Sequence, residues 1–178
     1  MDDIFERKKI LEAYIKGKDE DKFQILENIY LDTAQLLFKI DSDNISFPSE
    51  VEGNKTIAKV LSKDFNQKYD NVKTYYLSDD FSKQKWLVLM REKENENIRV
   101  GCGYYDWEFI RQRDNELKIK SHTIYIHEML NLNDKPLEYL LNMQKSFAYP
   151  WADKNRLIEV FEKFKELVAV TNYLKINP

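Results

Sequence analysis

The hydrophobic pattern of the chain changes at about residue 71, and this change restricts the fold more than any other feature. From there, apolar and polar residues alternate in four successive runs, which cover residues 71–80, 83–93, 97–112 and 116–130. Alternation with a period of two is typical of strands that bury one face, and short polar turns separate the runs. The pattern predicts four long antiparallel strands arranged as a meander.

Helical spacing precedes and follows these strands. Apolar residues three or four positions apart predict five helices, over residues 2–18, 19–32, 56–69, 136–151 and 152–174. Gly17 is expected to end the first helix, and Asp19 is a candidate N-cap of the second. A short strand is expected over residues 33–40, and an extended excursion or hairpin over residues 45–55. Helices followed by a long antiparallel sheet define an α+β chain, read as one domain.

Composition excludes several classes of protein. The net charge is −3 and no basic block stands out, so no nucleic-acid partner is expected. No apolar run is long enough to span a membrane, and the first residues lack an apolar signal core. A single cysteine cannot form an internal disulfide. A reduced, cytoplasmic protein is therefore expected. The 11 Tyr, 10 Phe and 3 Trp residues favour either a wet cavity or a broad interface, without choosing between them.

The stretch VGCGYYDWEF, residues 100–109, places the cysteine between two glycines. Cys102 as a nucleophile would need a nearby cation or histidine, and a buried cysteine is more often a small hydrophobic residue. Gly101 and Gly103 remove side chains from one face of a strand. They therefore favour strong curvature, or a ring from a neighbouring element lying against the backbone. A phosphate cradle is not indicated, because no helix follows a glycine-rich turn.

Alternation along this strand predicts which side chains share a face. One face would hold Ile98, Val100, Cys102, Tyr104, Asp106 and Glu108, and the other Arg99, Gly101, Gly103, Tyr105, Trp107 and Phe109. Asp106 and Glu108 could form an acid–base pair. Asp106 is the stronger candidate, since an enclosed carboxylate among aromatic residues would have a raised pKa.

The two histidines lie on the last predicted strand, five residues apart, so they should point to opposite faces. His122 would share its face with Ile124 and Ile126, and His127 would share the other with Ile119 and Met129. This spacing gives no compact ligand set, and no metal or other cofactor is expected. One of the two histidines, taken as His122, would line a cavity.

The order of the predicted elements, over about residues 4–130, resembles the NTF2-like superfamily, particularly its SnoaL-like branch. FPSEVEGNKTIAKVLSKDFNQKYDNV is similar to the segment that sets a glycine before the third helix in such proteins. VGCGYYDWEF followed by LKIKSHTIYIHEML resembles the pair of long strands that end the sheet. Residues 1–132 are identified as the NTF2-like domain. Residues 133–178 resemble a C-terminal helical extension of some bacterial members of unknown function, packed on the same domain.

The resemblance implies a cone: a curved antiparallel sheet wrapped around the N-terminal helices, with a cavity at its mouth. Homodimers that form through the sheet are common among such proteins, so a homodimer is expected. In ketosteroid isomerases of the superfamily, a helix tyrosine and a carboxylate after the second helix perform the chemistry. Tyr14 and Asp32 fall in roughly similar places.

Three functions stay open, because this fold hosts many activities. The first is binding of a small apolar or aromatic ligand in a partly apolar cavity. The cavity residues would be Tyr14, Tyr30, Tyr76, Tyr105, Trp107 and His122. The second is a cofactor-independent isomerase, cyclase or dehydratase, with Asp106, Asp32 or His122 as the base. The third is a dimeric assembly module without a ligand, in which aromatic strands meet across a two-fold axis. An interior filled by side chains would favour the third.

Overall fold

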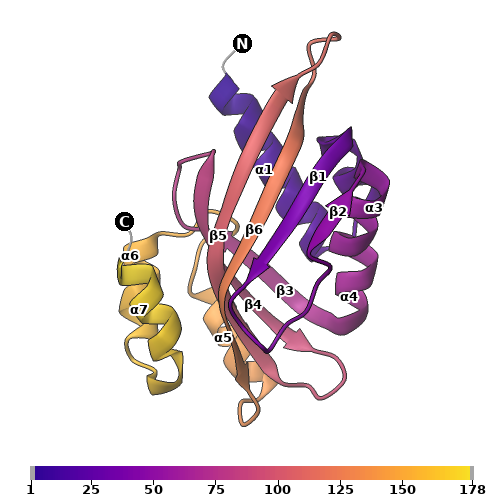
Figure 1. Ribbon diagram of the computed structural model, residues 1–178. Coiled ribbons are helices and arrows are strands. Elements are labelled where there is room, and N and C mark those ends of the chain that lie inside the picture. The colour runs from indigo at the N-terminus through magenta and orange to yellow at the C-terminus, as the bar shows by residue number, and fades with distance from the viewer. Residues whose placement is uncertain (1–2, 177–178) are drawn as a thin grey trace.

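The structure, a computed structural model, describes residues 3–176 and contains one curved mixed sheet (Figure 1). Its strands are β1 (Tyr30–Ile40), β2 (Glu50–Glu52), β3 (Tyr69–Tyr76), β4 (Lys83–Glu92), β5 (Ile98–Arg111) and β6 (Leu117–Leu132). Their order across the sheet is β2-β1-β6-β5-β4-β3. The predicted meander is confirmed, because β3, β4, β5 and β6 pair in sequence as antiparallel neighbours.

The position of β1 was not predicted. It pairs with β6 in parallel, so the sheet is mixed, and β2 forms a hairpin with it. The two long strands β5 and β6 therefore lie in the middle of the sheet, although they come last along the chain. A parallel neighbour needs a crossover through other elements. Here the crossover is the whole segment between β1 and β6, which contains a helical stretch and strands β2 to β5. Local sequence patterns do not show that strands so far apart pair.

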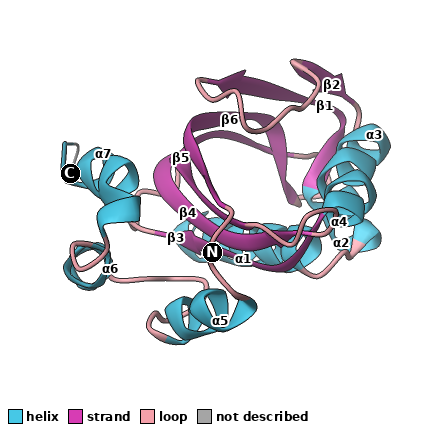
Figure 2. Ribbon diagram, turned by 90° about the horizontal axis from the view of Figure 1, so that it is seen from below, coloured by secondary structure: helices cyan, strands magenta, loops and turns pink. Residues whose placement is uncertain are grey.

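Two groups of helices cover the two faces of the sheet. The N-terminal group is α1 (Asp3–Asp19), α2 (Phe23–Ile29), α3 (Asn54–Lys59) and α4 (Phe65–Lys68), with a π-helical turn over Val60–Asp64 joining the last two. It packs on the concave face. The C-terminal group is α5 (Leu137–Lys145), α6 (Lys154–Phe161) and α7 (Val168–Ile176), and it lies outside the curl of the sheet (Figure 2). No helix within residues 3–176 is long and apolar enough to cross a membrane.

Several details of the predicted helices are wrong. The second predicted helix ends at Ile29, and Tyr30 already belongs to strand β1. The first helix runs through Gly17 and ends at Asp19, so this aspartate does not cap α2, whose N-cap is Lys22. The predicted helix over residues 152–174 is interrupted after α6. Phe164 has extended backbone angles there. This break lets Phe161 of α6 and Leu174 of α7 both reach the core on the convex face.

The alternation along β5 is confirmed. Tyr105 and Trp107 belong to the concave core, whereas Val100 and Cys102 pack under the C-terminal helices. Gly103 permits a close approach, because a Cβ atom there would lie 1.8 Å from the Tyr125 carbonyl oxygen and 2.9 Å from the Trp86 ring. The glycine thus permits a ring and a neighbouring strand to lie against the backbone, which is one of the two roles that the sequence indicated.

The face assignment along β6 is partly wrong. Two register shifts against β5, beside Gly103 and beside Phe109, reverse the alternation. Ile119 and Met129 therefore face the concave core together with His122, although alternation predicts the opposite face for them. A bulge inserts one residue into a strand and changes the hydrophobic pattern too little to be recognised in a single sequence.

A short strap, Tyr149–Ala152, ties the C-terminal helices to the body. The Tyr76 N–H donates to the Pro150 carbonyl (2.7 Å), and the Ala152 N–H donates to the Tyr76 carbonyl (2.9 Å), which extends the edge of β3. The Trp151 indole N–H donates to Glu12 Oε1 of α1 (2.8 Å). The strap therefore fixes the C-terminal extension to α1 and β3.

Candidate functional site

The six aromatic residues expected to line a cavity come together in one cluster on the concave side. Each is almost fully buried. α1 supplies Tyr14, the start of β1 supplies Tyr30, β3 supplies Tyr76, β5 supplies Tyr105 and Trp107, and β6 supplies His122. Every member contacts at least one other ring, with centroids 3.7–6.1 Å apart. We call this set the aromatic cluster. Its convergence is observed, and its role in binding stays a prediction.

His122 is the polar centre of the aromatic cluster. Its ring stacks on Trp107 with centroids 3.7 Å apart and planes 12° from parallel, and the edge of Tyr14 meets it at 5.2 Å. Its Nδ1 shares a hydrogen bond with the Tyr30 hydroxyl (2.8 Å). Burial lowers the pKa of His122 well below its usual value, so the imidazole is neutral at pH 7. Its Nε2 has no hydrogen-bond partner among residues 3–176.

This environment predicts a pH-dependent stability. The unfolded chain takes up a proton at His122 near pH 6.5, whereas the folded chain does not. The free energy of unfolding should therefore fall as the pH drops below about 6.5, by up to about 1.4 kcal/mol per pH unit from this residue. Urea denaturation at pH 7.5, 6.0 and 5.0 would measure the slope. We expect His122→Asn to flatten it. Identical slopes for His122→Asn and the wild type would contradict this account.

A cavity of about 40 Å³ lies next to the aromatic cluster and shares Tyr14 and Tyr105 with it. Lys18, Thr74 and Trp86 add polar groups to its wall, and the rest of the lining is apolar. This volume holds a few water molecules and is well below the roughly 300 Å³ of ordinary ligand sites. The Tyr14 hydroxyl and the Trp86 indole N–H have no hydrogen-bond partner within the described part of the chain. The cone is thus mostly filled, and its remaining space has polar groups at one end.

The hydroxyl of Tyr14 stays protonated at any ordinary pH. Burial raises its pKa well above the usual value, and the neighbouring Tyr105 raises it further. Burial also raises the pKa of Tyr30, Tyr76 and Tyr105. The aromatic cluster can therefore offer hydrogen bonds from neutral phenols and a neutral imidazole, and it carries no charge of its own.

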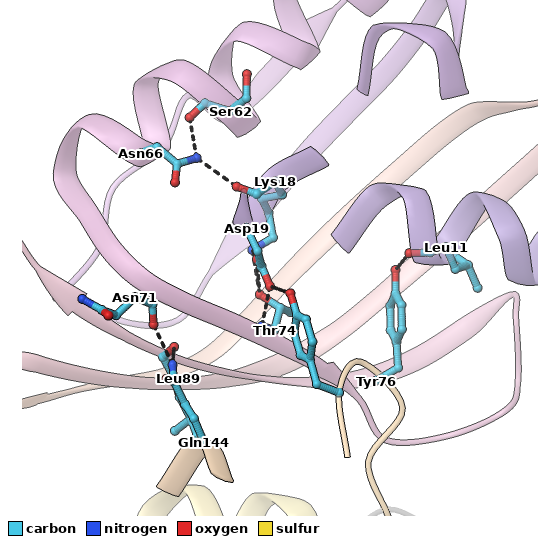
Figure 3. Close-up of polar contacts among 11 residues, drawn as sticks. Leu11, Lys18, Asp19, Ser62, Asn66, Asn71, Thr74, Tyr76, Leu89 and Gln144 are labelled. Atoms are coloured by element: carbon cyan, nitrogen blue, oxygen red, sulfur yellow. Dashed lines mark hydrogen bonds and ion pairs between the residues drawn. The ribbon is translucent and has the colours of Figure 1, made fainter. Parts of the chain in front are cut away.

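A buried ion pair forms the polar wall of the cavity, and Figure 3 shows it at the end of α1. The Lys18 ammonium donates to Asp19 Oδ1 (2.8 Å) and to the Thr74 hydroxyl (2.7 Å), and that hydroxyl donates to Asp19 Oδ1 (2.9 Å). The Thr74 N–H and the Tyr149 hydroxyl each donate to Asp19 Oδ2 (2.7 Å). The side chains of Lys18 and Asp19 are 8% and 1% exposed.

Sequence reasoning missed this ion pair. The signal that could have found it is the position of Lys18, which continues the buried stripe of α1 after Leu11, Tyr14 and Ile15. A lysine on the apolar stripe of a helix needs a buried partner. The partner lies next to it in the chain and was taken for a helix cap.

The two carboxylates proposed as bases do not join the aromatic cluster. Asp106 is exposed, because its neighbours Tyr105 and Trp107 take the concave face and leave it on the convex one. The expectation that aromatic side chains enclose Asp106 is therefore wrong. Glu108 is also exposed and pairs with Lys120 (3.2 Å). Asp32 lies exposed on β1, so the isomerase-like combination of Tyr14 with Asp32 is not formed.

Cys102 has the environment of a packing residue. It is fully buried on the convex side under the C-terminal helices, and burial raises the pKa of its thiol well above the usual range. Cys102 and His122 lie on opposite faces of the sheet. Within residues 3–176, no three His, Cys, Asp or Glu side chains lie close enough together to hold a metal ion.

Comparison with known proteins identifies the fold. No family model and no curated protein sequence matches the chain. Among solved structures, "The crystal structure of LinA" gives a TM-score of 0.55 at 13% identity, over 74% of this chain and 90% of that one. LinA-type3 from Novosphingobium barchaimii LL02, a hexachlorocyclohexane dehydrochlorinase, gives 0.53 at 14% identity, with the same coverage.

A third structure, the ketosteroid isomerase-like protein from Erwinia carotovora atroseptica SCRI1043, gives a TM-score of 0.52 at 7% identity. The match covers 71% of this chain and 98% of that one. Together these structures define the class: the chain has the NTF2-like fold, as its order of elements indicated. The expected α+β cone is confirmed, with a sheet that curls without closing into a barrel.

Proposed function

We propose that the protein binds a small, neutral, mostly apolar molecule in the concave interior, with one polar group directed at Tyr14. The observation that carries this proposal is the set of buried polar atoms without partners on this side of the sheet. Four of them belong to the aromatic cluster or to the wall of the cavity: Tyr14 Oη, Trp86 Nε1, Trp107 Nε1 and His122 Nε2, counted among residues 3–176. Each unpaired buried group costs about 1–3 kcal/mol, so a ligand that satisfied even one of them would gain affinity.

The charged groups of the interior cancel one another, and this favours a neutral ligand. Lys18 and Asp19 neutralise each other, and the aromatic cluster is uncharged at pH 7. An ionised ligand would lose its hydration in this apolar space without gaining a free counter-charge. A neutral hydroxyl or carbonyl compound fits these conditions better, because the tyrosine and indole groups can donate or accept single hydrogen bonds.

The ligand needs more room than the 40 Å³ observed, and one wall can provide it. Ile45 and Phe47 close the cavity from the loop between β1 and β2, and both are only partly buried. Met90 and Met129 also line the space, and methionine side chains adapt readily to a guest. Phe47 packs on Phe65 of α4 and also lines a neighbouring cavity, so its displacement would enlarge the interior space.

Binding of a hydroxyl compound should weaken when the Tyr14 hydroxyl is removed. Phenol and benzene differ by a hydroxyl, so we expect Tyr14→Phe to weaken phenol by about fivefold and to leave benzene unchanged. NMR titration of the tryptophan indole signals would measure both. Tyr139→Phe, the same change on α5, is the matched control. Native mass spectrometry of the purified protein would show any molecule it retains. If neither probe shifts the indole signals and no molecule is retained, the binding proposal fails.

An enzyme is the second candidate, and His122 is the observation that favours it. A neutral imidazole with one nitrogen held by Tyr30 and the other unpartnered has the features of a general base. LinA, which shares the fold, is described as a dehydrochlorinase, a class of enzyme that removes a proton. If an activity is found, its loss in His122→Gln with phenol binding retained would support this function. Unchanged activity in that variant would exclude His122 as the base.

The assembly module is less well supported in its expected form. The aromatic side chains that were to meet across a two-fold axis face the concave core, and α5, α6 and α7 cover much of the convex face. A homodimer stays a prediction, and it would have to use another surface.

A further inference from the structure

A lysine nitrogen forms part of the wall of the interior cavity. Lys18 lines this cavity together with apolar side chains that include Leu61, Phe65 and Val88. Its side chain is 8% exposed, so the ammonium is largely removed from bulk water. Lysine is rarely buried to this degree, and enclosure by apolar groups is one way in which proteins make its amine nucleophilic. The ion pair with Asp19 explains how the charge is tolerated, but it does not explain why the nitrogen lies beside a cavity.

The contacts of Lys18 hold its nitrogen in place and leave one side of it toward the cavity. On the polar side, Asp19 Oδ1 (2.8 Å) and the Thr74 hydroxyl (2.7 Å) accept hydrogen bonds from it (Figure 3). The nitrogen also lies 4.7 Å from the centre of the Phe65 ring, and this ring lines the cavity as well. An ammonium has three N–H groups, so the third is left for the side of the ring and the cavity.

Tyr14 is spaced along α1 so that it can act together with Lys18. The two residues are four positions apart, which places them on the same face of the helix, and both line the cavity. The Tyr14 hydroxyl has no hydrogen-bond partner within the described part of the chain. A carbonyl oxygen could accept a hydrogen bond from this hydroxyl while the carbonyl carbon lies near the lysine nitrogen. Such a hydrogen bond stabilises the negative charge that develops on the oxygen when an amine attacks.

We propose that the interior cavity binds an apolar aldehyde or ketone and that Lys18 forms an imine with it. This inference rests on the proposed function, because it uses the same cavity and narrows the neutral ligand to a carbonyl compound. The apolar part of the ligand would contact Phe65, Val88 and the other apolar residues of the wall. Lysine is the side chain that proteins use for covalent bonds of this kind to carbonyl carbons.

The groups around Lys18 account for every proton in this step. Asp19 first takes a proton from the ammonium, and the amine nitrogen then bonds to the carbonyl carbon while the π electrons of the C=O bond move to oxygen. A proton moves from nitrogen to oxygen, Asp19 returns its proton to the new hydroxyl, and water leaves. The product is a protonated imine on Lys18. Its positive charge remains on the same nitrogen, so the buried ion pair with Asp19 is kept.

Labelling with benzaldehyde and sodium cyanoborohydride at pH 7 would test the proposal, because the hydride reduces an imine to a stable benzylamine. Mass spectrometry of the digested protein then gives the rate at each lysine. We expect Lys18 of the native protein to react at least about tenfold faster than Lys16, an exposed lysine on the same helix, since binding holds the aldehyde beside the nitrogen. A lysine buried for structural reasons alone would react more slowly than Lys16. In urea the two rates should become equal.

Two further measurements connect the reaction to the cavity. Phenol, which has nearly the shape of benzaldehyde and no carbonyl group, should slow labelling of Lys18 and leave Lys16 unchanged. Tyr14→Phe should slow labelling of Lys18 by about fivefold, because the carbonyl oxygen loses its hydrogen bond. An unchanged rate in this variant would overturn the role given to Tyr14.

The results also separate this inference from the proposed function. If Lys18 reacts no faster than Lys16 in the native protein, the imine is overturned. Phenol binding seen by NMR in that case would leave the proposed function intact, whereas the absence of both would overturn both. Labelling of Lys18 that phenol does not slow would show that the aldehyde reaches the lysine without occupying the cavity, and this too would overturn the inference.

Discussion

Replacing Asp19 with Asn should lower the free energy of unfolding by about 3–5 kcal/mol, which is the usual cost of removing one partner from a buried ion pair. The change keeps the shape of the side chain and removes its charge. Lys18 would then hold an ammonium inside an apolar wall without a counter-charge. An amide also has a single oxygen, so it cannot accept from Lys18, the Thr74 N–H and the Tyr149 hydroxyl together.

Urea denaturation at pH 7 would measure this loss, and two variants make the measurement specific. Glu20→Gln changes the neighbouring, exposed acid and should cost less than about 0.5 kcal/mol. The double variant Lys18→Met with Asp19→Asn should recover part of the loss, because it removes the stranded charge. A loss below about 1 kcal/mol for Asp19→Asn would show that the pair is more hydrated than its burial indicates.

Replacing Gly103 with Ala should cost about 3 kcal/mol or more, since the added methyl group has no space. A Cβ atom would lie 1.8 Å from the Tyr125 carbonyl oxygen and 2.8 Å from its carbon, both backbone atoms of the adjacent strand. Strand β6 would have to move away from β5 at the bulge, and the Trp86 ring, 2.9 Å away, would have to move as well.

Gly101→Ala is the matched control on the same face of the same strand. The atoms nearest its Cβ are Met129 Cε at 2.3 Å and Sδ at 2.9 Å, the flexible end of a side chain. We expect a cost of about 1 kcal/mol, because the methionine can choose another rotamer. Thermal unfolding of both variants would separate them. Equal losses would mean that the backbone contact at Gly103 is no tighter than a side-chain contact.

The sequence predicted well whatever depends on local periodicity. The period of two placed four strands and divided β5 into its two faces, and this division brought Tyr105 and Trp107 into the concave core. Contacts between residues that are far apart in the sequence were harder to predict. The six aromatic residues were chosen through the resemblance to a fold, and the structure gathers them because that fold is correct.

Two of the errors have the same physical cause, which is that local sequence patterns do not report which strands pair or in which register. Bulges moved Ile119 and Met129 to the concave face of β6, and a parallel pairing placed β1 beside that strand. Asp106 was misplaced for a different reason. Aromatic neighbours in sequence were taken for neighbours in space, although adjacent residues of a strand point to opposite sides. Lys18 was missed because a charged residue is expected at the surface even when it continues an apolar stripe.

The strap and the ion pair also decide when the fold can be completed. Asp19 receives its last hydrogen bond from Tyr149, 130 residues further along the chain, and Glu12 bonds to Trp151 across 139 residues. During synthesis, α1 therefore cannot form these hydrogen bonds until residues 149–151 have been added to the chain. Contacts this distant in sequence slow folding, because a large loop has to close before they form. The nascent chain would meanwhile expose the sheet face that α5, α6 and α7 later cover, and chaperones bind such apolar surfaces.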